Sequence, residues 1–519
     1  MSIHARRFSQ LHEKTQEDIA TWKRIPLIFT LLLALCLLAC NPQAVTMPPT
    51  IVPGSPTSST SPVPLVVYAQ PDFTTRTLYP TGQNTLNNAG YITIDSHGGF
   101  YIADYNNNRV LHFPASTRPG AGPQADQVYG QPDYTSNAPH SGPAGLNRPH
   151  GIAVDPNGGL YISDMLNNRV LHYPAGSTIA DRVYGQTSFT ANQSNPAGPG
   201  ARSLYHPQGL AIGSTGLYVS DSSNNRVLHY PTGSTTADFV YGQGTPGNAS
   251  ANFTSNTSGS GATGLNNPRD VAVDSTGLYV ADSGNHRVLH YMLGNPTADR
   301  VYGQPDLTAT SVRPNQGRDI PTAATLNNPT MIALDKTSGF YIADRNNNRI
   351  LYYPPSAQSG GIDPPALRVY GQKSYSSRNS STTATTFNGP GAVAVDALGN
   401  VFVLDIFNQR VLKFLTGLHI SGQPPAHIAK GATLDMSVDL QDIGSGITFT
   451  DFTGQVIVRI KSGTGRAGAI LKGITAVHAV SGVVVFRGLS INQPGSGYTL
   501  TCSTHGYAPA DTIPFSIGA

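Results

Sequence analysis

Short apolar stretches separated by polar turns recur along most of this 519-residue chain. In one repeat they read GIAVD, GLYISD, RVLHY and RVYGQ, at residues 151–155, 159–164, 169–173 and 182–186. They are rich in Val, Ile, Leu and Tyr, which suit a pleated strand, and each has the usual length of a strand. Asn and Gly between them permit the left-handed backbone of tight turns. Since no window carries a sustained helical period, the pattern predicts four antiparallel strands per repeat.

One motif, D-x-x-N-x-R-[VI]-L, marks every repeat. It occurs six times, and consecutive motif arginines are 57 to 62 residues apart. A fixed period with variable filler is the signature of a repeat architecture, and four-stranded units repeated radially form a β-propeller. The motif residues are Asp104 and Arg109, Asp164 and Arg169, Asp221 and Arg226, Asp282 and Arg287, Asp344 and Arg349, and Asp405 and Arg410.

The two ends of the repeat array predict that the ring closes. The sixth repeat stops after RVLKF (residues 410–414) and has no VYGQ strand. A separate copy, VVYAQPDF (residues 66–73), precedes the first complete repeat. An N-terminal strand that completes the last blade would remove an exposed sheet edge. We therefore expect a six-bladed propeller over residues 65–417.

The repeat resembles the NHL repeat. The resemblance rests on a strand ending in Asp, a Gly turn, [LF]-Y-[IV]-[AS]-D and then x-x-N-N-R-[VI]-L, and it covers about two thirds of the chain. The interleaved VYGQ-PD segments are similar to those of bacterial surface NHL proteins. The resemblance implies a six-bladed propeller. It leaves function open, because the family includes both binding scaffolds and enzymes.

The N-terminal residues 1–40 are typical of a targeting segment. Basic residues precede an apolar run at residues 25–38, which is too short to span a bilayer comfortably. The run ends in Leu37-Leu38-Ala39-Cys40, which resembles a bacterial lipobox whose cysteine is lipidated. A plain secretory signal and a short anchor are the alternatives. Residues 41–64 are rich in Pro, Ser and Thr and predict an extended tether.

The C-terminal residues 418–519 lack the repeat motif and alternate apolar with polar positions. About a hundred residues of short alternating strands predict a β-sandwich. The stretch SGVVVFRGLSINQPGSGYTLTC, at residues 481–502, resembles bacterial Ig-like modules, with Cys502 in place of the usual small residue. The predicted fold class is therefore all-β: an NHL-type propeller followed by a small Ig-like sandwich.

The amino-acid composition limits the classes of partner that the sequence predicts. The formal net charge is +3 and no basic stripe occurs, which argues against nucleic acid. Charged residues make up 12% of the chain, against about a quarter in typical domains. Gly, Ser, Thr, Asn and Tyr take their place, which suits an extracytoplasmic protein. We expect a protein or glycan partner at the cell surface and a membrane reached through the lipid anchor.

Residues that recur in every blade are expected to support the fold. The motif aspartate can accept turn N–H groups and pair with the motif arginine across a tight turn. A histidine follows RVL in four blades, and these four are predicted to pack between blades rather than to share a metal: His112, His172, His229 and His290.

Residues that differ between blades are the better candidates for recognition. The positions after L-N-x-P enter the innermost strand, where side chains of all blades converge near the central channel. A polar set there is a default hypothesis for a ligand site. The candidates are Tyr91, His150, Gln208, Arg269 and Asp270. Arg269 would suit a carboxylate, and Tyr91 could stack on a ligand. The long loops at residues 244–264 and 305–325 are an alternative surface.

An enzyme is the rival hypothesis. Amidating lyases related to NHL proteins hold zinc with several histidines, and a catalytic zinc needs about three protein ligands. The rim offers His150, with His206 nearby. Lactonase-like propellers bind calcium, but a single carboxylate, Asp270, is weak evidence for a calcium site. Because no G-x-S-x-G motif and no phosphate loop occurs, the sequence favours a binding protein. We expect no catalytic residues, no metal ligands and no cofactor, with calcium left open.

Overall fold

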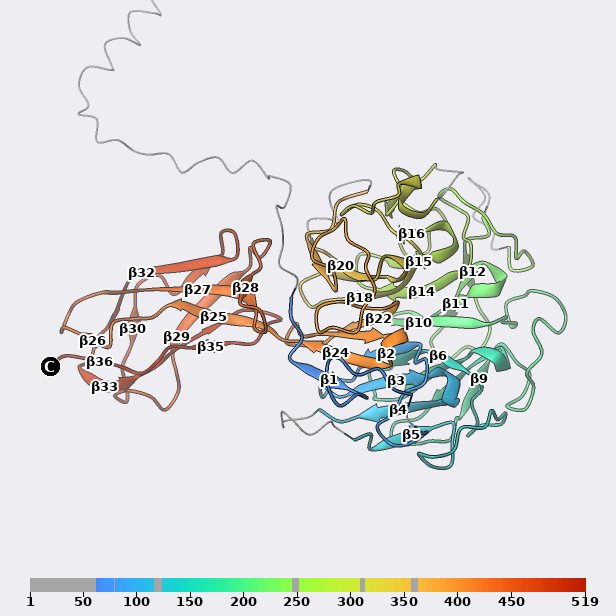
Figure 1. Cartoon of the computed structure of the whole chain (residues 1–519), viewed down its shortest axis with the longest axis horizontal. Coiled ribbons are helices and arrows are strands. Elements are labelled where there is room, and N and C mark those ends of the chain that lie inside the picture. The colour runs from blue at the N-terminus through green and yellow to red at the C-terminus, as the bar shows by residue number, and fades with distance from the viewer. Residues whose placement is uncertain (1–61, 79, 116–123, 245–251, 309–312, 356–362) are drawn as a thin grey trace, which may run out of the picture. The chain divides into compact units, whose positions relative to one another are not determined.

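The computed structural model describes residues 62–519, except for residue 79 and residues 116–123, 245–251, 309–312 and 356–362. The expected targeting segment and most of the expected tether lie outside these residues. The described chain is built from strands joined by turns and short 3₁₀ helices (Figure 1). No described residue belongs to a helix with the length and apolar character needed to cross a membrane.

Six four-stranded antiparallel sheets form the propeller, and each sheet is one blade. The inner strands come first in blades 1 to 5. Blade 1 contains β2 (Tyr91–Ile94), β3 (Phe100–Asp104), β4 (Arg109–Phe113) and β5 (Gln127–Tyr129). Blade 2 contains β6 (Pro149–Val154), β7 (Leu160–Asp164), β8 (Arg169–Tyr173) and β9 (Arg182–Tyr184). Blade 3 contains β10 (Pro207–Gly213), β11 (Gly216–Asp221), β12 (Arg226–Pro231) and β13 (Phe239–Tyr241).

The remaining blades follow the same order, except at the point of closure. Blade 4 contains β14 (Pro268–Val273), β15 (Leu278–Asp282), β16 (Arg287–Tyr291) and β17 (Arg300–Tyr302). Blade 5 contains β18 (Pro329–Leu334), β19 (Phe340–Asp344), β20 (Arg349–Tyr353) and β21 (Arg368–Tyr370). Blade 6 contains β22 (Pro390–Val395), β23 (Val401–Asp405), β24 (Arg410–Phe414) and β1 (Val66–Tyr68).

The ring closes through the N-terminal strand, as the repeat count predicts. Strand β1 pairs antiparallel with β24, with Val67 opposite Leu412, and lies beside it in Figure 1. Each inner strand contacts the inner strands of both neighbouring blades, including β22 with β2. The guanidinium of Arg410 also donates to the carbonyl of Phe73, which fixes the end of the closing segment.

Each blade is anchored by a buried Asp–Arg pair. In blade 3, Nε of Arg226 donates to Oδ2 of Asp221 (2.8 Å), and Nη2 donates to the carbonyls of Gly200 and Ser203 (3.0 Å each). Oδ1 of Asp221 accepts the N–H of Tyr205 (2.7 Å). All six motif arginines are fully buried and make the same ion pair. The motif is therefore a structural device that joins the third strand to the loop before the inner strand.

A second repeated contact joins each blade to the next. The residue that ends each 3₁₀ turn adopts left-handed backbone, as at Asn108 (φ 51°). Its side chain accepts a backbone N–H of the following blade, as Asn108 Oδ1 does from Arg148 (2.8 Å). At the closure, Gln409 Oε1 accepts the N–H of Asn88 (2.7 Å), so the chain of contacts is completed around the ring. The other four links have the same form.

Apolar cores lie between the blades and contain a recurring aromatic pair. The last aromatic residue of one blade contacts the third strand of the next, as Tyr129 does with Tyr173 at 5.4 Å between ring centroids in an edge-to-face arrangement. The same pairing recurs at four further interfaces. At the closure, Tyr68 contacts Phe100 instead, at 5.0 Å. Such pairs stabilise by about 0.5–1.5 kcal/mol beyond the area that they bury.

The C-terminal residues form three further sheets. The first contains β25 (Thr416–Gly422), β27 (Leu434–Asp442), β28 (Ile447–Thr448), β30 (Leu471–Lys472) and β32 (Val483–Ile491). The second contains β29 (Gln455–Ile460), β31 (Ala476–His478), β34 (Leu500–Ser503) and β35 (Ala510–Asp511). The third contains β26 (His427–Ile428), β33 (Gly495–Tyr498) and β36 (Phe515–Ile517). Strand β25 thus begins two residues before the expected boundary at residue 418.

The C-terminal sheets share one apolar core, as a sandwich requires. Val438 and Phe486 of the first sheet and Val458 and Leu500 of the second belong to one buried cluster. Cys502 is fully buried in the same core, and burial raises the pKa of its thiol to about 12. Its position is therefore that of a small apolar residue. The closer likeness to Ig-like modules stays a prediction.

The buried ion pair leads to a prediction about stability. Arg226→Met should lower the free energy of unfolding by about 3–5 kcal/mol, because it leaves the Asp221 carboxylate buried without its counter-charge. Urea denaturation followed by circular dichroism measures this change. Arg202→Met is the matched control, since Arg202 is exposed. Equal unfolding midpoints for the two variants would contradict a structural role for the pair.

Candidate functional site

The entry to each inner strand is built so that one side chain is turned out of the ladder. In blades 2 to 6 a residue with positive φ precedes a proline, as Arg148 (φ 51°) precedes Pro149. Pairing is regular at Pro149–Asp164 and resumes at Ile152–Ile162, with a register shift between. Bulges of this kind redirect side chains. His150, Gln208 and Arg269 all lie in such a shifted stretch of their own blade.

We call the end of the channel that these residues surround the mouth. His150 packs over blade 1, where a Cβ at Gly90 would lie 3.1 Å from its Cδ2 atom. The His150 ring also contacts Tyr105 edge-on at 6.4 Å, and the guanidinium of Arg148 lies 5.3 Å from the centre of the Tyr105 ring. Burial is the main cause that lowers the pKa values of His150 and Arg269, and the charge of Arg345 is a smaller cause of both shifts. The mouth residues are Tyr105, His150, Gln208, Arg269 and Arg345.

Tyr105 and Arg345 were not among the residues expected from the sequence. Each directly follows the motif aspartate of its blade, at the start of a 3₁₀ turn: η2 (Tyr105–Asn107) and η7 (Arg345–Asn347). The residue at this position differs from blade to blade, although the motif aspartate and arginine are the same in every blade. The variable residues are Tyr105, Met165, Ser222, Ser283, Arg345 and Ile406. The contrast between an invariant aspartate and a variable neighbour was the available signal.

The expectation that Tyr91 and Asp270 are exposed on the rim is wrong. Tyr91 is 4% exposed and Asp270 is fully buried. The Tyr91 hydroxyl donates to Oδ1 of Asp270 (3.0 Å), and the N–H of Ile332 donates to Oδ2 (2.8 Å). Blades 1 and 4 stand on opposite sides of a six-membered ring, so the bond crosses the channel. Both side chains therefore lie next to the mouth, bound to each other, and do not face its opening.

Burial strongly perturbs the Asp270 carboxyl. It raises the pKa of Asp270 to about 8, although the hydrogen bonds from Ile332 and Tyr91 oppose the shift. Burial also raises the pKa of Tyr91 well above its ordinary value, and the charge of Asp270 adds to that shift. Asp270 is therefore mostly protonated at pH 7 and supplies little negative charge to the mouth. Both of its oxygens are occupied.

The mouth holds cationic groups that lack a counter-charge. Burial, followed by the charge of Arg345, lowers the pKa of Arg269 to about 10. Burial, followed by the charges of Arg269 and Arg345, lowers the pKa of His150 to about 3. Nδ1 of His150 and Nε of Arg269 are buried and have no hydrogen-bond partner within the described part of the chain. In that same part, no carboxylate lies within 4.0 Å of the guanidinium nitrogens of Arg269 or Arg345.

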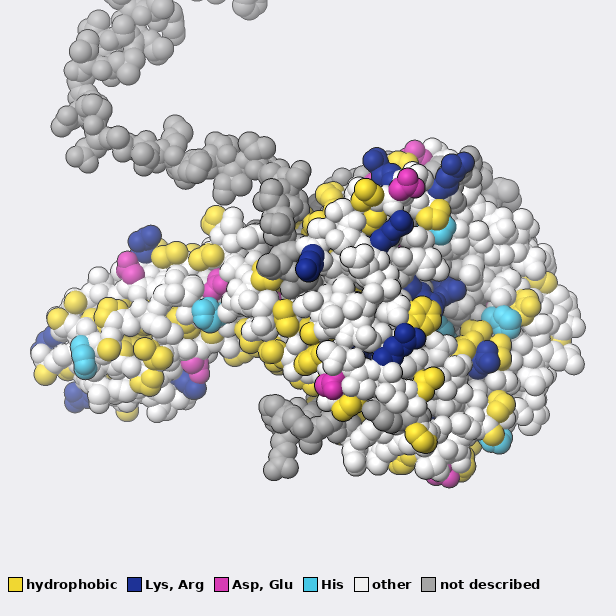
Figure 2. Space-filling model, viewed as in Figure 1, with side chains coloured by type: hydrophobic (Ala, Val, Ile, Leu, Met, Phe, Trp, Pro, Cys, Tyr) yellow, Lys and Arg dark blue, Asp and Glu magenta, His cyan; other side chains and the backbone are white. Residues whose placement is uncertain are grey.

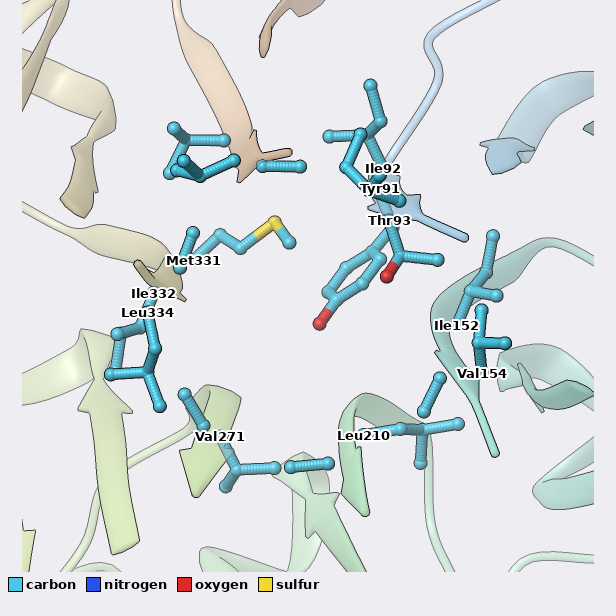
Figure 3. Close-up of a pocket in the computed structure, with 18 of the residues that line it drawn as sticks. Tyr91, Ile92, Thr93, Ile152, Val154, Leu210, Val271, Met331, Ile332 and Leu334 are labelled. Atoms are coloured by element: carbon cyan, nitrogen blue, oxygen red, sulfur yellow. The ribbon is translucent and has the colours of Figure 1, made fainter. Parts of the chain in front are cut away.

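A cavity of about 260 Å³ occupies the channel beyond Tyr91. Aliphatic side chains of all six blades line it, as Figure 3 shows for Ile152, Val154, Leu210 and Val271. Tyr91 extends from β2 toward the middle of the channel. None of the five mouth residues lines this cavity. The mouth and the aliphatic cavity are therefore separated at the level of Tyr91.

The histidines that follow RVL do not converge. Each lies within its own blade and binds aspartate, as His112 does through Nε2 to Asp95 (2.9 Å). His290 binds Asp299 through Nδ1 (2.6 Å), which is equivalent to the contact of His112 Nδ1 with Asp126 (2.5 Å). His206, near the mouth, contacts Ser223 Oγ through Nδ1 (3.1 Å). Across the described ranges, no group of three or more His, Cys, Asp or Glu residues has the arrangement of a metal site.

The buried carboxyl leads to a prediction about pH. An unfolded aspartate titrates near pH 4, so between about pH 4 and 8 the folded chain keeps a proton on Asp270 that the unfolded chain has lost. The contribution of Asp270 to stability therefore decreases as the pH rises through this window. Asp270→Asn removes the titration. Its melting temperature relative to the parent should rise between pH 5 and pH 8, as measured by thermal denaturation at both values.

Asp319→Asn is the control for that experiment, because Asp319 is an exposed aspartate of the same propeller. It should show the same offset from the parent at both pH values. An offset for Asp270→Asn that does not change with pH would contradict the raised pKa.

One protein-family model matches two segments of the chain. The family model described as NHL repeat matches residues 146–173 and 265–291, which lie in blades 2 and 4. No curated protein matches the chain. Virginiamycin B lyase from Staphylococcus aureus is 12% identical, with a TM-score of 0.35, over 65% of this chain and 96% of that chain.

Two further solved structures have similarly distant likeness. The extracellular domain of a putative hybrid two-component system from B. thetaiotaomicron is 12% identical, with a TM-score of 0.39, over 89% of this chain and 56% of that chain. The WD40 β-propeller domain of Doa1 is 8% identical, with a TM-score of 0.37, over 68% of this chain and 96% of that chain. The matched NHL segments and the six four-stranded sheets together support an NHL β-propeller.

Proposed function

We propose that this protein is a non-catalytic binding protein that recognises a protein or glycan through the mouth face of its propeller. The observation that carries this proposal is a pair of buried nitrogen atoms at the mouth that lack hydrogen-bond partners within the described residues. Arg269 and His150 each hold a buried nitrogen without a hydrogen-bond partner within the described residues. Buried polar groups are nearly always hydrogen-bonded, so an exception needs an explanation. A bound ligand would supply the missing partners.

The chemistry of the mouth supports binding over catalysis. General acid–base catalysis needs a group that titrates near the working pH and reaches the substrate. The pKa of His150 is lowered to about 3, so this histidine is neutral and a weak base. Asp270 has a pKa nearer neutrality, but Tyr91 and the N–H of Ile332 occupy its oxygens. The mouth residues can hold a ligand without providing a nucleophile or a base.

The surface outside the mouth is suited to a protein that works outside the cytoplasm. Charged side chains are few, and Figure 2 shows them as separate groups on a largely uncharged surface. With the lipobox-like sequence before Cys40 and the Pro/Ser/Thr-rich residues 41–64, this composition supports a propeller tethered to a bacterial membrane by lipid. In such an arrangement the spacer would hold the mouth away from the membrane, where a surface partner could reach it.

The binding proposal is tested with the full chain, purified in detergent and applied to glycan and peptide arrays. Arg345→Gln should weaken every specific hit by about 10- to 100-fold, because a hydrogen bond from a charged group contributes about 1.5–3 kcal/mol. Arg202→Gln, which changes an exposed arginine, should bind as the parent does. Melting temperatures would show that all three proteins are folded.

Two results would count against this proposal. Hits that Arg345→Gln leaves unchanged would place recognition away from the mouth. Recovery of the bound molecule in a cleaved or rearranged form, as detected by mass spectrometry, would show that the protein is an enzyme.

Anchoring is tested separately. Cys40→Ser removes the only sulfur that the lipobox-like sequence offers for lipidation, so the protein should leave the membrane fraction or fail to mature. Fractionation and immunoblotting measure this, with Cys502→Ala as the control because Cys502 is buried in the C-terminal core. Unchanged membrane association of Cys40→Ser would reject lipidation at this residue.

A further inference from the structure

The mouth is a blind opening. The bond between Tyr91 and Asp270 crosses the channel from one side of the ring to the other (3.0 Å). The aliphatic cavity beyond it is lined by Tyr91 and by none of the mouth residues (Figure 3). A ligand that enters from the mouth face therefore stops at Tyr91 and Asp270. Such a ligand presents either an end of its chain or one projecting group.

The groups at the floor of this opening are cationic or hydrogen-bonding. Arg269 is the chain neighbour of Asp270, and His150 packs over Gly90, the chain neighbour of Tyr91. The guanidinium of Arg345 lies 5.2 Å from the centre of the Phe407 ring. After burial, its charge is a further cause of the lowered pKa values of Arg269 and His150. The end of an entering chain therefore meets two guanidinium groups and one imidazole.

The two arginines of the mouth form no ion pair within the described part of the chain. No carboxylate within the described residues lies within ion-pair distance of Arg269 or Arg345. Asp270 is the acidic residue nearest to Arg269 in the chain, yet its oxygens accept the Tyr91 hydroxyl and the Ile332 N–H. Asp344 precedes Arg345, but its oxygens bind Arg349 and other groups of its own blade. Partly buried arginines without a counter-charge favour an anion from outside the protein, and the planar guanidinium matches a carboxylate with two parallel hydrogen bonds.

We propose that the mouth binds the C-terminal carboxylate of a polypeptide that enters end-on. This inference rests on the proposed function and narrows its partner from a protein or glycan to a peptide end. Every unmodified polypeptide ends in a carboxylate, whereas the end of a neutral glycan chain carries none. Arg269 and Arg345 hold the two carboxylate oxygens, and Nδ1 of His150 gains a hydrogen-bond partner. Gln208, in the shifted stretch of blade 3, binds the last peptide group.

The test uses two pools of fluorescein-labelled random tetrapeptides that differ only at the C-terminus, one as free acids and one as amides. The full chain in detergent is titrated into each pool, and fluorescence anisotropy is measured. The free-acid pool should bind saturably, and the amide pool should bind at least tenfold more weakly. Added sodium acetate should compete with the free-acid pool.

Matched variants assign the effect to the mouth. Arg269→Gln should weaken binding of the free-acid pool at least tenfold, and Arg269→Lys should recover part of it, because the charge returns without the paired hydrogen bonds. Arg202→Gln should bind as the parent does. Arg345→Gln serves as the second mouth variant should Arg269→Gln fail to fold, which thermal denaturation would reveal.

Several outcomes would overturn the inference. Equal affinity for acids and amides, no binding of either pool, or binding that both mouth variants leave unchanged would each reject carboxylate recognition. Arg269-dependent binding of oligogalacturonate, without peptide binding, would reject the peptide end and leave the proposed glycan recognition in place. The proposed function itself fails if the arrays show no hit that depends on Arg345, or if the bound molecule is recovered in a cleaved or rearranged form.

Discussion

The buried pair between the motif aspartate and arginine is the interaction on which the propeller depends. In blade 3, Arg226 binds Asp221 of its own turn, the carbonyls of Gly200 and Ser203, and the carbonyl of Phe253. One side chain thus joins the end of the second strand, the third strand, the loop before the inner strand and the loop that follows the outer strand. A buried charge is tolerated only when it is paired and hydrogen-bonded. Every repeat must therefore supply all of these partners together.

This constraint also decides where the blades are free to differ. The residue after the motif aspartate and the residue after the inner-strand proline have no part in the ion pair. At these positions the repeats place the mouth residues Tyr105, Arg345, His150, Gln208 and Arg269, whereas Ser222 and Ser283 are buried and donate to carbonyls of the next blade. The repeated Asp–Arg pairs are therefore the same in every blade, whereas the residues at the mouth differ from blade to blade. Recognition can be specified by the mouth residues without changing the Asp–Arg pairs.

The bond between Tyr91 and Asp270 links this opening to the closure of the ring. It joins two blades that are not neighbours, and it requires space that only glycine leaves. A Cβ at Gly209 would lie 2.2 Å from Oδ1 of Asp270, so a larger residue there would displace the carboxyl group. The same bond removes from the mouth the acidic residue nearest to Arg269 in the chain. The positive charge of the mouth therefore depends on the contact between Tyr91 and Asp270 that closes the channel.

The sequence by itself determined the strands, the number of blades, the closing strand and the Asp–Arg pairs. These features depend on alternation, turn chemistry and a motif repeated six times, all of which act over short stretches of chain. From the equivalent positions in the repeats it also predicted that His150, Gln208 and Arg269 lie near the channel. Only the tertiary structure decided that Tyr91 and Asp270 are buried, because their contact spans 179 residues and exists only in the closed ring. It likewise added Arg345, since desolvation and the proximity of like charges depend on neighbouring blades and not on local sequence.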